Sequence, residues 1–151
     1  MASPFPFTSG QVLTAAQLNS IGDVTAFTPS WTNFTPGNAV EDWVYVQVND
    51  LVLVRGLTVL GSTSSMSTSP YFEIPVGTIK DDEVSVGQTN YKLGSDRYIG
   101  LVFSGTTDDL LLRTHLVSGS YIEVTNVNAT TPATWTTGDE IRVHAVYSVE
   151  S

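Results

Sequence analysis

Hydrophobic and polar residues alternate with a period of two along most of the chain, which is the pattern of half-buried β-strands. The segment 43–48 (WVYVQV) is rich in β-branched and aromatic residues, and a second such segment, 51–60 (LVLVRGLTVL), follows the turn residues Asn49 and Asp50. Together the two segments predict a β-hairpin. Gly56, inside the second segment, predicts a bulge or a close approach of another group to the backbone.

Shorter segments of the same kind follow, separated by Gly, Pro, Ser and Asn residues. Residues 110–117 and 121–127 flank Ser118-Gly119-Ser120 and predict a second hairpin. A final strand is expected over 140–149, with Ile141, Val143, Ala145 and Tyr147 on one side. Further strands are expected over 71–74, 84–86 and 97–103, whereas 25–42 and 62–69 have the composition of irregular connections.

Roughly eight short strands with turns between them predict an all-β protein, namely an antiparallel β-sandwich or jelly roll. The chain has 151 residues, the size of one domain. A domain of that size buries roughly 68–70% of its unfolded surface, so packing alone suffices for stability. We expect a short N-terminal arm and helix over residues 1–23 and a β-sandwich domain over residues 24–151.

The arm has the pattern of a short capped helix instead of a strand. Thr14 and Gln17 have the spacing of a capping box. Gly22 stands where a helix commonly ends in a left-handed residue. We therefore expect a two-turn helix over 15–21, and a helix this short is unstable alone in water. It needs a surface on which to dock.

Two phenylalanines precede this helix on a segment that Pro4 and Pro6 hold extended. Burying each aromatic ring gains roughly 1.5–3 kcal/mol over leaving it in water. The arm either folds back on its own domain or docks on a different chain as an anchor, and the second is our working hypothesis. The candidate assembly residues, all of them apolar, are Phe5, Phe7, Val12, Leu13, Leu18 and Ile21.

Charge and composition narrow the classes of partner. The net charge is -9, with six Lys and Arg against fifteen Asp and Glu, so nucleic acid and anionic membrane surfaces are not expected partners. The absence of cysteine removes disulfides and thiolate catalysis. Residues 1–22 lack the basic start and apolar run of a signal peptide, and no apolar stretch has the length of a membrane span, so we expect no membrane insertion.

Candidate catalytic groups are few. Acidic residues cluster at 81–83 and 108–109, between expected strands, where carboxylates are usually solvated turn residues. Calcium accepts oxygen ligands from such loops, but the DxDxDG spacing is missing. His115 and His144 lie in expected strands and are interpreted as hydrogen-bonded structural residues. We expect no enzyme activity, metal or cofactor; a glycosidase carboxylate pair stays open, since such acids meet only in the fold.

Aromatic residues form a second group of candidates. Exposed aromatic rings suit the apolar faces of sugars, so these residues are candidates for a sugar-binding platform. Aromatic side chains also commonly fill the end of a β-sandwich or a subunit interface. Both interpretations apply to the five candidate ligand or interface aromatics, Trp31, Phe34, Trp43, Tyr45 and Trp135.

Several motifs resemble those of tailed-bacteriophage virion proteins. Residues 5–19 (FPFTSGQVLTAAQLN) resemble the F-x-x-G-x-x-L-T-A-A-x-L-N opening of many tail-fibre and minor tail proteins. Residues 46–52 resemble a strand and turn of those proteins, with Asn49 in place of the usual glycine. Residues 73–76 stand in the position of a later L-P segment, and 135–141 (WTTGDEI) resemble the W-x-x-G-D-x-I motif before the final strand.

The resemblance implies a virion structural protein that is assembled in the host cytoplasm as a homotrimer through its N-terminal arm. The arm and its helix would bind the three-fold partners or other virion proteins of the tail or capsid. Apolar residues on both faces of 43–46 are compatible with a neighbouring subunit. A small tail fibre or tail-tip protein would contact a host-surface glycan or protein through loops such as 62–70 and 104–109. The alternatives are a capsid decoration or head-fibre protein and a free carbohydrate-binding module.

Overall fold

The structure is a computed structural model that describes residues 12, 14, 15 and 22–150. The helix expected over 15–21 lies outside the described residues except for Ala15, so the helix is not seen. Val12 is described and exposed. The other candidate assembly residues, which lie outside the described residues, are Phe5, Phe7, Leu13, Leu18 and Ile21.

The described residues form ten β-strands, which confirms the all-β prediction. In chain order the strands are β1 (Thr25–Ala26), β2 (Trp31–Thr35), β3 (Val40–Val48), β4 (Leu51–Val59), β5 (Ser65–Glu73), β6 (Ser85–Leu93), β7 (Asp96–Ser104), β8 (Asp109–Ser118), β9 (Tyr121–Asn126) and β10 (Glu140–Ser148).

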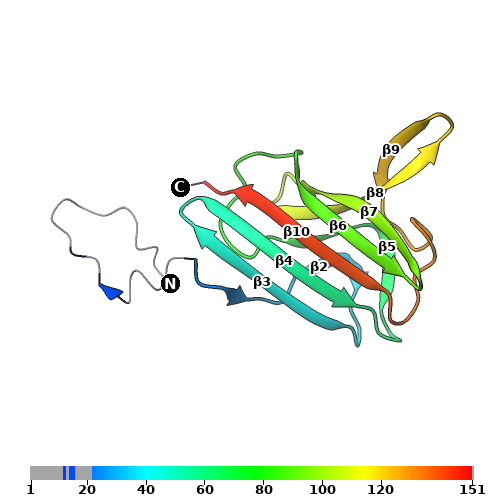
Figure 1. The fold of residues 1–151 in the computed structure, drawn as a ribbon, viewed down its shortest axis with the longest axis horizontal. Helices are drawn as coiled ribbons and strands as arrows, with labels where there is room; N and C mark the ends of the chain where they lie inside the picture. The colour runs from blue at the N-terminus through cyan, green and yellow to red at the C-terminus, as the bar shows by residue number, and fades with distance from the viewer. Residues whose placement is uncertain (1–11, 13, 16–21, 151) are drawn as a thin grey trace.

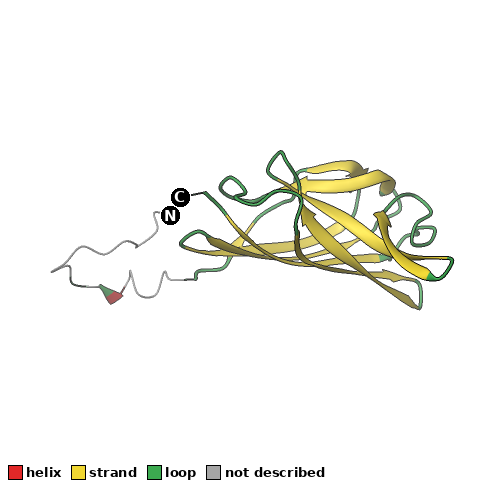
Figure 2. Cartoon of the chain, turned by 90° about the horizontal axis from the view of Figure 1, so that it is seen from above, coloured by secondary structure: helices red, strands yellow, loops and turns green. Residues whose placement is uncertain are grey.

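Hydrogen bonds join these strands into one antiparallel sheet in the order β1-β3-β4-β10-β6-β7-β8-β5-β2, with β9 paired to β8 (Figure 1). The sheet curls, so that strands from its two ends face each other (Figure 2). The antiparallel prediction is confirmed. The division into the two separate sheets of a sandwich or jelly roll is not confirmed, because hydrogen-bonded neighbours run without a break from β1 to β2.

The two predicted hairpins and the final strand are confirmed, whereas two of the expected loops are wrong. The segment 25–42 contains β1, β2 and the start of β3, and the segment 62–69 overlaps β5. The pairing of β2 with β5 shifts register between Thr32 and Phe34, and Asn33 and Ser69 have positive φ angles of 60° and 56°. This bulge accommodates Pro70, since proline in a sheet is confined to edges and bulges.

Trp43, in β3, lies at the centre of the core and packs directly on the backbone of Gly56 in β4. The two residues are register partners. A Cβ atom on Gly56 would lie 2.1 Å from the Trp43 ring, so only glycine leaves room for the indole there. The close approach predicted at Gly56 is therefore confirmed, and its cause is the indole ring.

Aromatic rings around Trp43 join the two ends of the curled sheet. Phe72 of β5 lies 4.8 Å from Trp43 between ring centroids, and Trp31 of β2 lies 5.6 Å away, both edge to face. Phe27, between β1 and β2, is also edge to face with Trp43, with 5.8 Å between ring centroids. Because β3 lies near one end of the strand order and β2 and β5 at the other, this aromatic cluster holds the curl closed.

Hydrogen bonds between side chains reinforce the same closure. The Trp43 Nε1–H donates to Thr58 Oγ1 at 3.0 Å, and the Thr58 hydroxyl donates to Glu41 Oε1 at 3.2 Å. The Trp31 Nε1–H donates to the same Glu41 oxygen at 2.8 Å. Both indole N–H groups are thus satisfied inside a largely apolar region, where an unpaired donor would be destabilising.

We predict that Gly56→Ala lowers the free energy of unfolding by about 1–3 kcal/mol, because the added methyl group overlaps the Trp43 ring and forces the core to shift. Urea denaturation followed by tryptophan fluorescence measures the change. In a Trp43→Leu background the same substitution is expected to cost less, since the overlapping ring is gone. An equal cost in both backgrounds would show that the indole is not the cause.

Candidate functional site

The structure brings four of the five candidate aromatics together. Trp43 and Phe34 are buried, and Trp31 and Tyr45 are half-buried against the same aromatic cluster. Trp135 lies apart, edge to face with Tyr91 at 5.5 Å, and its Nε1–H donates to the Asn128 carbonyl at 2.9 Å. Burial of Trp43 and Phe34 places these two rings in the core, and the five residues do not share one surface.

The acidic pair 108–109 ties its loop to the segment between β5 and β6 and to a neighbouring threonine. Asp108 Oδ1 accepts a hydrogen bond from the Ile79 N–H at 2.7 Å, and Asp109 Oδ2 accepts one from Thr107 Oγ1 at 2.7 Å. Among the described residues no three His, Cys, Asp or Glu side chains are placed to hold a metal ion. No helix in the described part of the chain is long and apolar enough to span a membrane.

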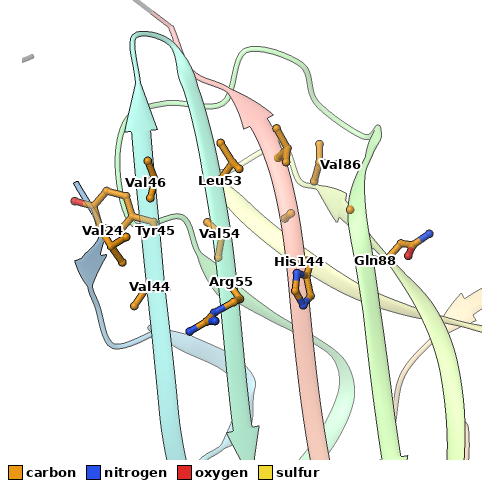
Figure 3. A pocket seen from close by; sticks show the side chains of 13 residues that line it. Val24, Val44, Tyr45, Val46, Leu53, Val54, Arg55, Val86, Gln88 and His144 are labelled. Carbon is orange, nitrogen blue, oxygen red and sulfur yellow. The ribbon is translucent and has the colours of Figure 1, made fainter. Parts of the chain in front are cut away.

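An apolar groove crosses the outer face of the sheet, opposite the core (Figure 3). Strand register places Val46 of β3, Leu53 of β4 and Val146 of β10 side by side in one row. Leu53 is 44% exposed and Val146 is 46% exposed. We call this surface the outer groove; its apolar lining on the outer face is formed by Val24, Val44, Val46, Leu53 and Val146, and Val86, which packs against the core, lies at its border.

The outer groove is open to solvent, has a volume of about 600 Å³ and is polar along one side. The next row of the sheet runs from Val44 through Arg55 and His144 to Gln88. None of the described residues that line the groove is acidic. Arg55 lies 3.9 Å from Asp42, with both side chains well exposed, so this ion pair contributes little and leaves Arg55 available to a partner.

The chain passes the outer groove where the N-terminal arm joins the sheet. Val24 lines the groove, and a Cβ atom on Gly22 would lie 3.7 Å from Val46 Cγ1. At the same end of the molecule the Val149 N–H donates to the carbonyl of Asp50 in the β3–β4 turn, at 2.7 Å. Residues 22–24 and the last described residues therefore both lie beside the groove end of the sheet (Figure 1).

The sequence predicted one half of this surface. Apolar residues on both faces of 43–46 are confirmed, since Trp43 and Tyr45 point to the core side and Val44 and Val46 line the outer groove. Leu53 and Val146 were missed as surface candidates. The sequence indicates them only through the continuous apolar run 51–54. A strand with one buried face needs apolar residues at alternate positions only, so such a run indicates apolar side chains on both faces.

Charged residues replace the apolar ones toward the other end of the same face. Glu140 of β10 accepts a hydrogen bond from Lys92 Nζ at 2.6 Å and forms a second ion pair with Arg142 at 2.6 Å. The hydrogen bond from Lys92 first, and that from Arg142 second, lower the pKa of Glu140 below its ordinary value of 4.5. The outer face of β10 thus changes from paired charges at Glu140 to exposed apolar surface at Val146.

Comparisons with protein-family models, with curated proteins and with solved structures gave no significant match to this chain. The functional inference for this chain is therefore based on its sequence motifs and on the geometry of the outer face of its sheet.

We predict that Glu140→Gln lowers the free energy of unfolding at pH 7 by no more than about 1 kcal/mol, since the pairs are near the surface. A lowered folded-state pKa contributes stability above the unfolded pKa, and this contribution is lost as the pH falls through the folded value. The difference between wild type and variant should therefore shrink below about pH 4.5, the ordinary pKa of Glu. Urea titrations at pH 7 and pH 3 measure it, and a difference that grows on acidification would contradict the assignment.

Proposed function

We propose that this chain is a non-enzymatic structural protein of a tailed-phage virion, assembled as a homotrimer and attached to other virion proteins through its N-terminal arm. The single observation that carries this proposal is that an arm rich in apolar residues joins the sheet beside an exposed apolar groove on its outer face. Exposed apolar surface of this kind marks interaction sites in soluble proteins.

One of the resembling motifs, residues 135–141, forms a hydrogen-bonded turn before the last strand. The Asp139 carboxylate accepts hydrogen bonds from the backbone N–H groups of Thr136, at 2.6 Å, and Gly94, at 2.8 Å. It thereby fixes the turn of the W-x-x-G-D-x-I segment and ties it to the β6–β7 turn. The aspartate of this motif therefore has a structural role in the fold, and no chemistry need be assigned to it.

Within this proposal the protein is a small tail-fibre or tail-tip protein, because the arm resembles the opening of tail proteins. We regard the curled sheet as a jelly-roll variant in which hydrogen bonds continue between the facing halves. The second candidate is a capsid decoration protein. The number of copies per particle separates the two, since decoration requires far more copies than a tail tip.

We predict that the double substitution Phe5→Ser and Phe7→Ser leaves the sheet folded but prevents incorporation into virions, because the arm loses its apolar anchors. Near-ultraviolet circular dichroism of the three tryptophans checks the fold, and immunoblotting of purified particles measures incorporation. Deletion of residues 1–22 is expected to give the same pair of results.

The matched control is Val40→Ser, an exposed apolar position on β3 that lies outside the arm and the outer groove. This variant is expected to incorporate like the wild type. Loss of the fold on deletion of the arm would show that the arm belongs to the core, and wild-type protein absent from virions would end the proposal.

A further inference from the structure

The outer groove and the N-terminal arm are two apolar surfaces that one chain leaves uncovered. In the groove, Leu53 is 44% exposed and Val146 is 46% exposed. In the arm, Val12 is 83% exposed, and Ala15 is exposed as well. Figures 1 and 2 show the described arm residues, drawn in blue in Figure 1, beyond the end of the sheet. The described residues of the arm therefore do not cover the groove of their own chain.

The arm joins the sheet at the border of the outer groove. A Cβ atom on Gly22 would lie 3.7 Å from Val46 Cγ1, and Val24 lines the groove. Residues 13–21, which lead into Gly22, can reach at most about 30 Å when extended. That length lets the arm leave its own sheet and reach a neighbouring copy whose groove lies near the same end. Copies that meet at this end would each bring one arm and one groove to the contact.

The composition of the arm suits burial in this groove. Residues 1–22 contain no Asp, Glu, Lys or Arg, and no other stretch of the sequence is as long without a charged residue. None of the described residues that line the groove is acidic, and its arginine, Arg55, faces Asp42. Burying a charge without a partner is costly, and an uncharged segment enters the groove without that cost. The arm is therefore the segment of this acidic chain that the groove accepts most readily.

The helix expected over 15–21 has the length that the groove requires. Seven residues at 1.5 Å each give a helix of about 10 Å. The apolar row of the groove crosses β3, β4 and β10, and three adjacent strands span about 10 Å from first to last. Leu18 and Ile21 are three residues apart, so they would lie on one side of this helix. Gly22 has a φ of 77°, the left-handed conformation in which helices commonly end.

We propose that the arm of one copy docks in the outer groove of a neighbouring copy, with Leu18 and Ile21 against the apolar row. The arm and the groove are different surfaces, so the contact is heterologous, and such contacts close into a ring when the rotation between copies permits. Exchange of arms covers both apolar surfaces at once. The inference rests on the proposed function for the number of copies, and it leaves Phe5 and Phe7 to bind other virion proteins.

Crosslinking between two chains tests the docking, because the chain has no cysteine. One full-length chain has Ser20→Cys in the arm, and a second, differently tagged chain has Gln88→Cys at the polar side of the groove. Neither substitution removes an apolar side chain. After co-expression and treatment with a short bis-maleimide, we expect a covalent dimer that has both tags. The matched control pairs Ser20→Cys with Val40→Cys, which is exposed but does not line the groove, and should give no such dimer.

Other results of this experiment would overturn the docking. If one chain with both Ser20→Cys and Gln88→Cys is crosslinked internally and keeps the mass of a monomer, the arm folds back on its own groove. If two Gln88→Cys chains crosslink and neither reacts with Ser20→Cys, the grooves face each other. The absence of every crosslink in an oligomeric sample would exclude the arm from the groove.

Sedimentation gives an independent measurement that needs no crosslinker. Leu18→Asp in the arm or Leu53→Asp in the groove should weaken self-association roughly tenfold to a hundredfold. Combining Leu18→Lys with Leu53→Asp should restore part of the loss, because opposite charges then meet. Val40→Asp should have no effect. Leu53 is partly exposed, so its variant should stay folded, and near-ultraviolet circular dichroism checks this.

The docking and the proposed function can fail separately. If the Leu18→Asp and Leu53→Asp proteins sediment like the wild-type oligomer, or if the wild-type protein sediments as a monomer, the docking is wrong, whatever the content of the virions. If the wild-type protein is absent from virions, the proposed function is wrong, even where Ser20→Cys and Gln88→Cys crosslink between chains.

Discussion

The packing of Trp43 on the backbone of Gly56 is the constraint on which the rest of this structure depends. Because Gly56 has no side chain, the Trp43 indole lies directly against the backbone of β4. This position leaves room for Phe72 and Trp31, which come from the far end of the strand order. The hydrogen bonds through Thr58 and Glu41 then fix both indoles. One small residue thus allows a single antiparallel sheet to curl onto itself and enclose a core.

The curl of the sheet determines which side chains are buried in the core and which remain on the outer surface. Once alternate side chains of β3, β4 and β10 are committed to the core, the intervening ones must face outward, and near the β3–β4 turn they are apolar. One face of these strands therefore builds the core, while the other face presents exposed apolar side chains. The paired charges at Glu140 mark where the outer face returns to an ordinary solvated surface.

Local patterns in the sequence were enough to predict the parts of the fold that depend on neighbours in the chain. The hairpin at Asn49-Asp50, the hairpin at Gly119 and the final strand all follow from turn residues and period-two alternation. β2 and the first part of β5, residues 65–70, were missed because their serines, threonines and Pro70 resemble a loop, whereas the end of β5 falls in the strand expected over 71–74. The outer groove was only half predicted, because the row from Val46 to Val146 exists through pairing between strands far apart in sequence.

The hydrogen bond from Val149 to Asp50 has a practical consequence for labelling this protein. A reporter fused after the last strand would emerge beside residues 22–24, at the end of the sheet where the chain leads into β1. A short epitope inserted at Gly119, whose positive φ marks a tight turn with open space around it, would instead be displayed at the distant extremity. Comparing antibody access to the two tags in an assembled sample would therefore show which end of the molecule is exposed.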